Sequence, residues 1–76
     1  MDEALLLSNF GDRLRTSRLA LGLSQEKLAL DCGLDRTYIS SVERGKGNVS
    51  LLNIHKLAAA LGIQAAELLI TKGDSK

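Results

Sequence analysis

Apolar residues recur every three or four positions along most of the chain, which is the spacing of one face of an α-helix. Glycine follows the periodic stretches at positions 22, 33, 45 and 62, and short polar side chains precede several of them. The pattern predicts five helices, with approximate bounds at residues 2 or 8 to 21, 24 to 33, 35 to 44, 50 to 62 and 65 to 70. We therefore expect an all-α fold, a compact five-helix domain.

The same period predicts which side chains face the core. Ser24, Asp35 and Ser50 are the expected N-caps; Lys27 stands where a reciprocal capping box would need Glu, so the Ser24 cap should be single. The fourth helix has the cleanest apolar period. The expected inward residues are Leu7, Phe10, Leu14 and Leu21; Leu28, Ala29 and Cys32; Ile39 and Val42; and Leu51, Ile54, Leu57, Ala58 and Leu61.

A chain of 76 residues has room for one domain, which we place over residues 1–76, with residues 72–76 as a flexible tail. A chain of this length buries only a small hydrophobic core, so association with a second subunit would help to stabilise the fold. Proline is absent and the aromatic residues are Phe10 and Tyr38, which favours helices over strands. The chain has no apolar run long enough to cross a membrane, and its start is acidic, whereas that of a signal peptide would be basic. Its single cysteine, Cys32, cannot form a disulfide within the chain. We therefore expect a soluble cytoplasmic protein with no membrane contact.

Residues 24–44 hold the most informative pattern, two short predicted helices joined by a tight turn. Two helices that cross steeply need a small residue where they approach and a glycine where the chain reverses. Ala29 and Gly33 meet these needs. The apolar residues expected to lock the pair to the domain are Leu28, Cys32, Leu34, Ile39 and Val42. This combination predicts a helix-turn-helix of the kind that reads DNA.

Four stretches follow one family pattern in order, and they are FGDRLR at 10–15, GLSQE at 22–26, ISSVERG at 39–45 and LAAALG at 57–62. In these stretches the sequence resembles the XRE family of Cro-like and phage-repressor-like helix-turn-helix proteins. Ser17, where the family usually has a core aliphatic, and Val49, where it often has proline, depart from the pattern. The resemblance implies a λ-repressor-like fold and sequence-specific binding of double-stranded DNA to regulate transcription. It also implies that Glu43 pairs with Arg18 as a structural ion pair.

Within that family, the small size and the segment LDRTYIS at 34–40, with Asn48 shortly after, resemble the controller proteins of restriction-modification systems. The narrower resemblance implies a homodimer that activates its own operon and represses it at higher occupancy, so RNA polymerase is a candidate partner. An antitoxin of the same fold, whose main partner is a toxin protein, remains the alternative, and a helical interaction module without DNA binding is disfavoured by the polar start of the third helix.

The third predicted helix separates polar from apolar residues. At about 100° per residue, five of its polar residues fall within an arc of roughly 140°, with Tyr38, Ile39 and Val42 on the other side. A recognition helix needs such a face, and its N-terminal residues meet base edges in the major groove. The candidates for base reading are Arg36, Thr37, Ser40, Ser41 and Arg44.

Contacts to DNA phosphate are expected around this face. The net charge is only +1, but residues 13–46 carry seven basic and four acidic residues, an excess of three positive charges. Helix N-termini add free N–H groups and a positive dipole. The candidates for phosphate binding are Gln25, Tyr38, Lys46, Asn48 and Ser50.

A specific site of this kind is normally read by a two-fold dimer on two half-sites. Beside the core arc of the fourth helix lies a mostly apolar strip that the core does not need, and three apolar residues in succession in the fifth helix cannot all face inward. The expected dimer interface is Leu52, His55, Ala59, Leu68, Leu69 and Ile70.

Other chemistry is disfavoured by the sequence. His55 is the only histidine, and it has neither a cysteine cluster nor a Ser-His-carboxylate spacing near it, so we expect no enzyme, no metal site and no cofactor or small-molecule ligand. The glycines at 45 and 47 follow a helix rather than a strand, which favours a helix end over a nucleotide loop. Cys32 fits a buried turn position better than a redox sensor.

Overall fold

The computed structural model describes residues 2–70 and, within them, consists of helices and the loops between them. The helices are α1 (Glu3–Ala20), α2 (Gln25–Cys32), α3 (Arg36–Glu43), α4 (Leu51–Leu61) and α5 (Ala65–Leu68). The all-α five-helix prediction is thus confirmed. The predicted tail at 72–76 lies outside the described residues.

Polar side chains fix the starts of the helices, and glycines fix several of the ends. Asp2, Ser24 and Ser50 each accept a hydrogen bond from the backbone N–H three residues later. Asp35 is the N-cap residue of α3, although its side chain makes no cap hydrogen bond. Gly33 ends α2 in the left-handed conformation at φ 72°, which glycine adopts without steric cost.

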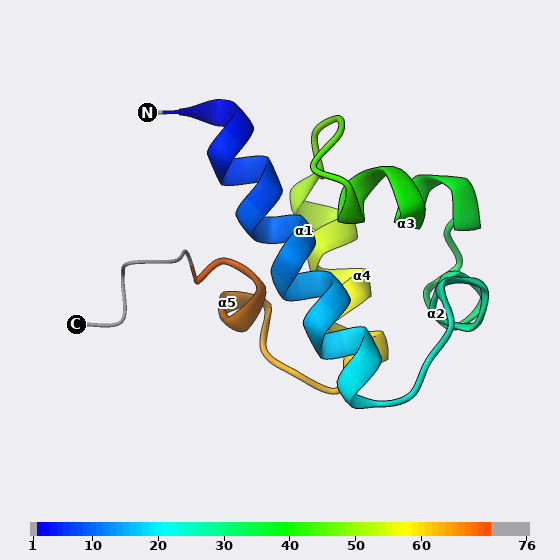
Figure 1. Cartoon of the computed structure of the whole chain (residues 1–76). Helices are drawn as coiled ribbons and strands as arrows, with labels where there is room; N and C mark the ends of the chain where they lie inside the picture. Colours follow the sequence, from blue (N-terminus) through cyan, green and yellow to red (C-terminus); the bar gives the residue numbers. More distant parts are fainter. Residues whose placement is uncertain (1, 71–76) are drawn as a thin grey trace.

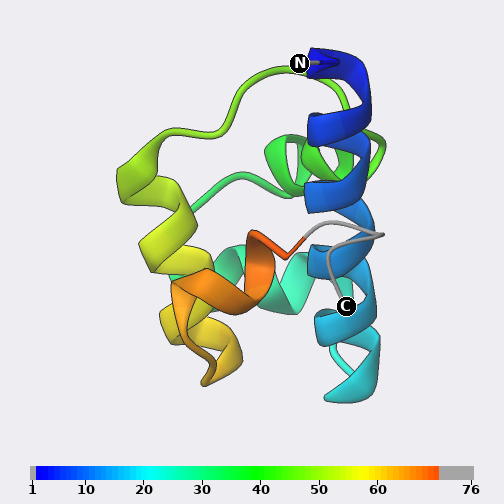
Figure 2. The same cartoon turned by 90° about the vertical axis from the view of Figure 1, so that its left-hand side faces the viewer.

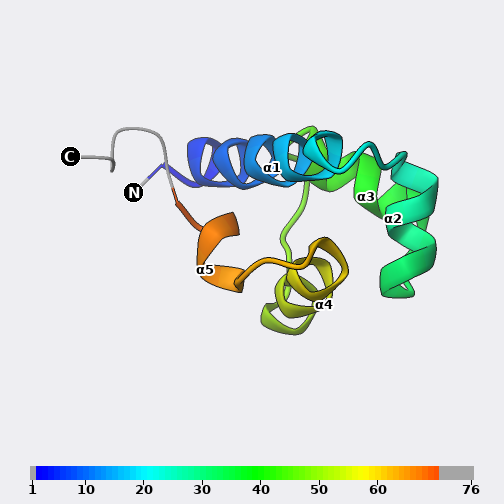
Figure 3. The same cartoon turned by 90° about the horizontal axis from the view of Figure 1, so that it is seen from below.

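Figure 1 labels the five helices, and Figure 3 shows α1 on one side of the domain with α4 and α5 on the other; the core lies between them. Helix α1 contacts α3 and α5, α2 contacts α3 and α4, and α4 contacts α5. Viewed from below, α2 lies at one end of α1, while α5 lies toward its other end (Figure 3). The loop between α3 and α4 arches from the side of α1 across to the start of α4 (Figure 2). The helix-turn-helix therefore forms one end of the molecule.

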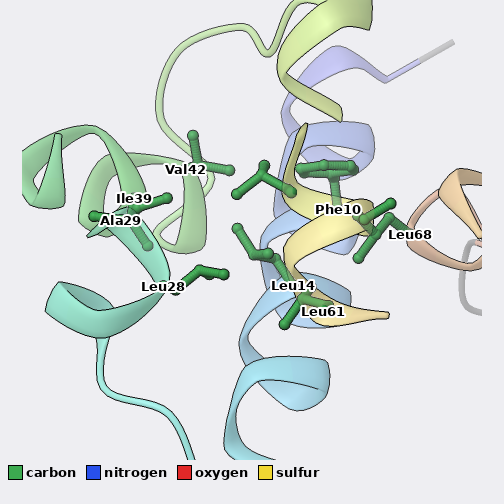
Figure 4. Packing of buried hydrophobic residues seen from close by; sticks show 10 residues of the cluster. Phe10, Leu14, Leu28, Ala29, Ile39, Val42, Leu61 and Leu68 are labelled. Atoms are coloured by element: carbon green, nitrogen blue, oxygen red, sulfur yellow. The ribbon is translucent and has the colours of Figure 1, made fainter. Parts of the chain in front are cut away.

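One continuous core joins all five helices (Figure 4). Leu14, Leu28, Ile39, Leu57 and Leu68 are its fully buried side chains. Gly11 makes room for α3, because a Cβ atom there would lie 2.5 Å from the carbonyl oxygen of Val42 and 2.7 Å from that of Glu43. The close crossing of α1 over the end of α3 therefore depends on this glycine.

Two residues that the helical period placed in the core are exposed. Leu21 is 54% exposed, because α1 ends at Ala20 and the chain turns at Gly22, so that Leu23 packs against the core instead. Leu51 is 70% exposed at the first residue of α4, where Val49 and Ile54 provide the packing. Both predictions were wrong because these residues lie at helix ends. The apolar period continues there, but no neighbouring helix covers the side chain.

The prediction that Leu68 belongs to a dimer interface was wrong. Leu68 is fully buried in the core, near Phe10, because α5 is a single turn held against both α1 and α4 (Figure 4). Helix α5 also ends at Leu68 rather than near Ile70. Leu69 and Ile70, which follow it, are exposed.

Candidate nucleic-acid interface

Helix α3 exposes a polar face at the end of the molecule formed by the helix-turn-helix (Figure 1). Its opposite face carries Ile39 and Val42, which are buried in the core. The five predicted base-reading residues are all exposed or partly exposed, and they are Arg36, Thr37, Ser40, Ser41 and Arg44. The structure therefore brings these five residues together on one outward-facing helix surface.

Arg44 and Ser40 are coupled one turn apart on this face. Arg44 Nη1 donates a hydrogen bond to Ser40 Oγ at 2.9 Å. A hydroxyl that accepts a hydrogen bond keeps its own proton for another acceptor. Ser40 can thus donate to a base edge or a phosphate while Arg44 stays in place.

The turn before α3 is closed by backbone bonds and a small side chain. The Leu34 N–H donates to the carbonyl of Ala29 at 3.0 Å, across Gly33. Ala29 is buried at the approach of α2 to α3, and Leu34 packs against the core. These contacts fix the angle at which α2 presents α3 to a ligand.

An ion pair between α1 and α3 holds α3 on the side opposite its polar face. Arg18 Nε lies 2.7 Å from Glu43 Oε2, and Nη2 lies 3.0 Å from Oε1, so the pairing is bidentate. Arg18 Nη1 also donates to the Leu23 carbonyl at 2.7 Å. The hydrogen bond with Glu43 raises the pKa of Arg18, although burial alone would lower it. The pair expected from the family resemblance is present in the structure.

Gln25, predicted as a phosphate anchor, belongs to the same network. Its Nε2 donates to Glu43 Oε1 at 3.0 Å. The amide retains a second N–H and a carbonyl oxygen for contacts outward from the first residue of α2. The sequence assigned Gln25 to DNA and Glu43 to the scaffold, whereas the structure joins the two.

Tyr38 and the start of α4 lie side by side at the edge of the polar face. Asn53 Nδ2 donates to the phenol oxygen of Tyr38 at 3.1 Å. Ser50 Oγ accepts the N–H of Asn53 at 3.1 Å and so caps α4. Lys46, Asn48 and Ser50 are exposed on the loop that joins the two helices. The structure thus joins Tyr38 of α3 to the start of α4, and Lys46, Asn48 and Ser50 lie in the segment between these two helices.

Asn53 was missed by the sequence reasoning. It is the amide side chain in the first turn of α4, whose other polar residues are His55 and Lys56, and that position was the available signal. A periodicity argument sorts residues into faces of one helix, so it does not reveal a hydrogen bond to a residue fifteen positions earlier on another helix.

The remaining titratable groups do not form a metal site among residues 2–70. Within this range, the structure has no group of three or more His, Cys, Asp or Glu side chains that could hold a metal ion. No described helix is long and apolar enough to cross a membrane. Cys32 is half-buried in α2, and burial raises the pKa of its thiol.

Comparison with known proteins places the chain in a family. Residues 14–68 match the helix-turn-helix family model HTH_3. The chain belongs to this family. The predicted resemblance and fold are thereby confirmed. The match covers the whole of α2, α3, α4 and α5.

Three similar proteins indicate which members of the family this chain resembles. The restriction-modification controller protein C.AhdI of Aeromonas hydrophila is 61% identical, with a TM-score of 0.80, over 82% of this chain and 94% of that chain. Control protein C.BamHI of Bacillus amyloliquefaciens is 56% identical over 79% of this chain and 75% of that protein. A hypothetical transcription factor of Neisseria meningitidis is 51% identical over 91% of this chain. The prediction of a DNA-binding transcriptional regulator is confirmed by these relatives. The chain spans 65% of the length of the Neisseria protein.

Proposed function

We propose that this helix-turn-helix protein is the controller of a restriction-modification operon and binds its operator as a homodimer. The observation that carries the proposal is the polar face of α3, outward on one side and fixed from behind by Arg18 and Glu43. A rigid helix with exposed polar side chains is what insertion into the major groove requires. The similarity to C.AhdI and C.BamHI supports the restriction-modification operon as the target.

In this proposal, α3 supplies the base contacts. Arg36 and Thr37 lie in the first turn, where a recognition helix enters the groove, and Arg36 is suited to the O6 and N7 atoms of guanine. Ser40, Ser41 and Arg44 follow along the same face. Phosphate contacts then come from the residues around it, which are Gln25, Tyr38, Lys46, Asn48 and Ser50.

The proposed dimer surface lies on α4 and just after α5. Leu52 is 65% exposed and Leu69 is 53% exposed, while His55, Ala59 and Ile70 are also exposed. Exposed apolar side chains that lie together in a patch are typical of an interaction surface. Leu69 and Ile70 also line an apolar cavity of about 200 Å³ together with Leu6, and this cavity offers a partner side chain a place to insert.

The proposal excludes catalysis and cofactors and places the protein in the cytoplasm, where the operator DNA is. Activation of the operon would require contact with RNA polymerase, which we retain as a second macromolecular partner. A toxin partner is not part of the proposal, because the relatives described above are control proteins and a transcription factor.

Footprinting on the DNA upstream of the gene tests the proposal. We expect protection of two half-sites about 34 Å apart, centre to centre. The affinity should fall steeply between low and physiological salt, since phosphate contacts release counterions. A protein that gave no footprint, or an affinity that hardly changed with salt, would contradict the proposal.

A further inference from the structure

Asn53 joins the proposed recognition helix to the start of α4. Its side-chain Nδ2 donates to the phenol oxygen of Tyr38 on α3 at 3.1 Å. Its backbone N–H donates to Ser50 Oγ at 3.1 Å in the N-cap of α4. Both Asn53 and Tyr38 are half-buried, and the ring of Tyr38 packs against the core. The phenol is therefore held at both its ring and its oxygen.

The direction of this hydrogen bond decides what the phenol can do. A tyrosine hydroxyl has one proton to donate and also accepts hydrogen bonds. Because the oxygen accepts the amide proton of Asn53, its own proton remains for an acceptor outside the protein. A phosphate oxygen is such an acceptor, and half or more of the hydrogen bonds in protein–DNA complexes go to the phosphate and sugar.

The same bond places the phenol beside the first turn of α4. The N–H groups of Leu51 and Leu52 precede the two N–H groups that Ser50 engages, so they lie at the open end of this helix. Helix N-termini favour anions through these groups and the helix dipole. One phosphate at this position would meet the phenol from α3 and the helix terminus from α4.

We propose that Asn53 is a positioning residue for DNA binding, which fixes the Tyr38 phenol so that its proton points to a phosphate. The inference rests on the proposed function and deepens it. Asn53 need not touch DNA itself. Its effect on affinity is exerted through Tyr38, and this dependence separates the proposal from a role that only ties α3 to α4.

A double-mutant cycle on the footprinted duplex tests this dependence. We expect Tyr38→Phe and Asn53→Ala each to weaken binding about five- to tenfold, the worth of one hydrogen bond. Asn53→Ala should add no further loss in the Tyr38→Phe background. In an Arg36→Ala background, where the altered contact is independent, Asn53→Ala should keep its full effect. Alanine suits a helix interior, so α4 itself is not weakened.

Two further measurements distinguish positioning from stability. Thermal unfolding of each variant sets a temperature at which all are folded, and a residue that only ties the helices together would leave binding there unchanged. Ethylation interference should show that Asn53→Ala and Tyr38→Phe lose sensitivity at the same phosphate. The proposal would be overturned if Asn53→Ala left DNA affinity unchanged, or if it lowered the affinity equally in the wild-type and Tyr38→Phe backgrounds. If the wild-type protein itself gave no footprint, that result would instead contradict the proposed function.

Discussion

Glu43, the last residue of α3, receives hydrogen bonds from Arg18 of α1 and from Gln25 of α2, at 2.7 to 3.0 Å. The Arg18 and Glu43 side chains are only 9% and 4% exposed. One carboxylate thus ties α3, the proposed recognition helix, to both α1 and α2. The pair also needs its third contact, from Arg18 to the Leu23 carbonyl, to satisfy the guanidinium.

We expect Glu43→Ala to lower the free energy of unfolding by about 3 to 5 kcal/mol, because it leaves a buried guanidinium without its counter-charge. The matched control is Asp31→Ala, which breaks the exposed pair with Lys27 on α2 and should cost no more than about 1 kcal/mol. Urea titrations of both variants measure the two costs. Equal losses in the two proteins would contradict the structural role of Glu43.

Gly11 provides a test of the α1–α3 crossing. In an open helix position, replacing glycine with alanine stabilises a protein by about 0.5 to 1 kcal/mol. Here the new Cβ would meet the Val42 and Glu43 carbonyl oxygens at 2.5 and 2.7 Å. We therefore expect Gly11→Ala to destabilise the fold by about 1 to 3 kcal/mol. A melting temperature at or above that of the wild type would show that α1 can move away without cost.

Most of this fold could be predicted from the sequence, because its signals are local. Glycines and capping residues mark helix ends, and the apolar period marks the buried faces. The period failed at Leu21 and Leu51, since it says which way a side chain points but not whether another helix lies opposite. It failed at Leu68 for a related reason: one turn is too short to define a face, and only the packing against α1 and α4 decides it.

The candidate site also has features that could be predicted from local sequence and contacts that could not. The polar face of α3 follows from the spacing of residues within one helix, and the structure has that face. The contacts that fix it join residues far apart in the chain, such as Gln25 with Glu43 and Tyr38 with Asn53. A single sequence carries no direct record of such pairs, so the resemblance to a family predicted the Arg18 pair and nothing predicted Asn53.

Cys32 should be a slow nucleophile in the folded protein. Burial raises its thiol pKa, so at a given pH the folded chain holds less thiolate than the unfolded chain. The stabilisation from this shift is present below the unfolded pKa and is lost as the pH rises through the folded value. We expect alkylation by iodoacetamide at pH 8 to be slower in the native protein than in denaturant. Equal rates in both states would show that burial does not protect the thiol.

Replacing Arg36 tests the direction of the DNA face. We expect Arg36→Ala to cost about 1 to 3 kcal/mol of specific binding and to relax the preference at one base pair in each half-site. Arg36→Lys is the matched variant, because it keeps the charge but not the planar fork that contacts guanine. It should largely retain the salt dependence while losing the base preference. An unchanged preference in both variants would place base reading elsewhere.

The dimer surface can be tested by placing charge on it. Leu52 on α4 and Leu69 after α5 are exposed apolar residues in the proposed interface, and a carboxylate buried there would be left unpaired. The control is Leu30→Asp, at the most exposed large apolar residue of α2, where Leu30 is 76% exposed and lies outside the proposed interface.

We expect the wild type to sediment as a dimer at micromolar concentration and to dissociate on dilution, because the apolar patch is small. Leu52→Asp and Leu69→Asp should shift the equilibrium to monomer, and they should weaken binding to a two-half-site operator more than binding to a single half-site, since only the former gains from the pairing of two subunits. Leu30→Asp should leave the sedimentation unchanged. A wild type that stays monomeric, or a dimer that both substitutions leave intact, would place the subunit contact on another face.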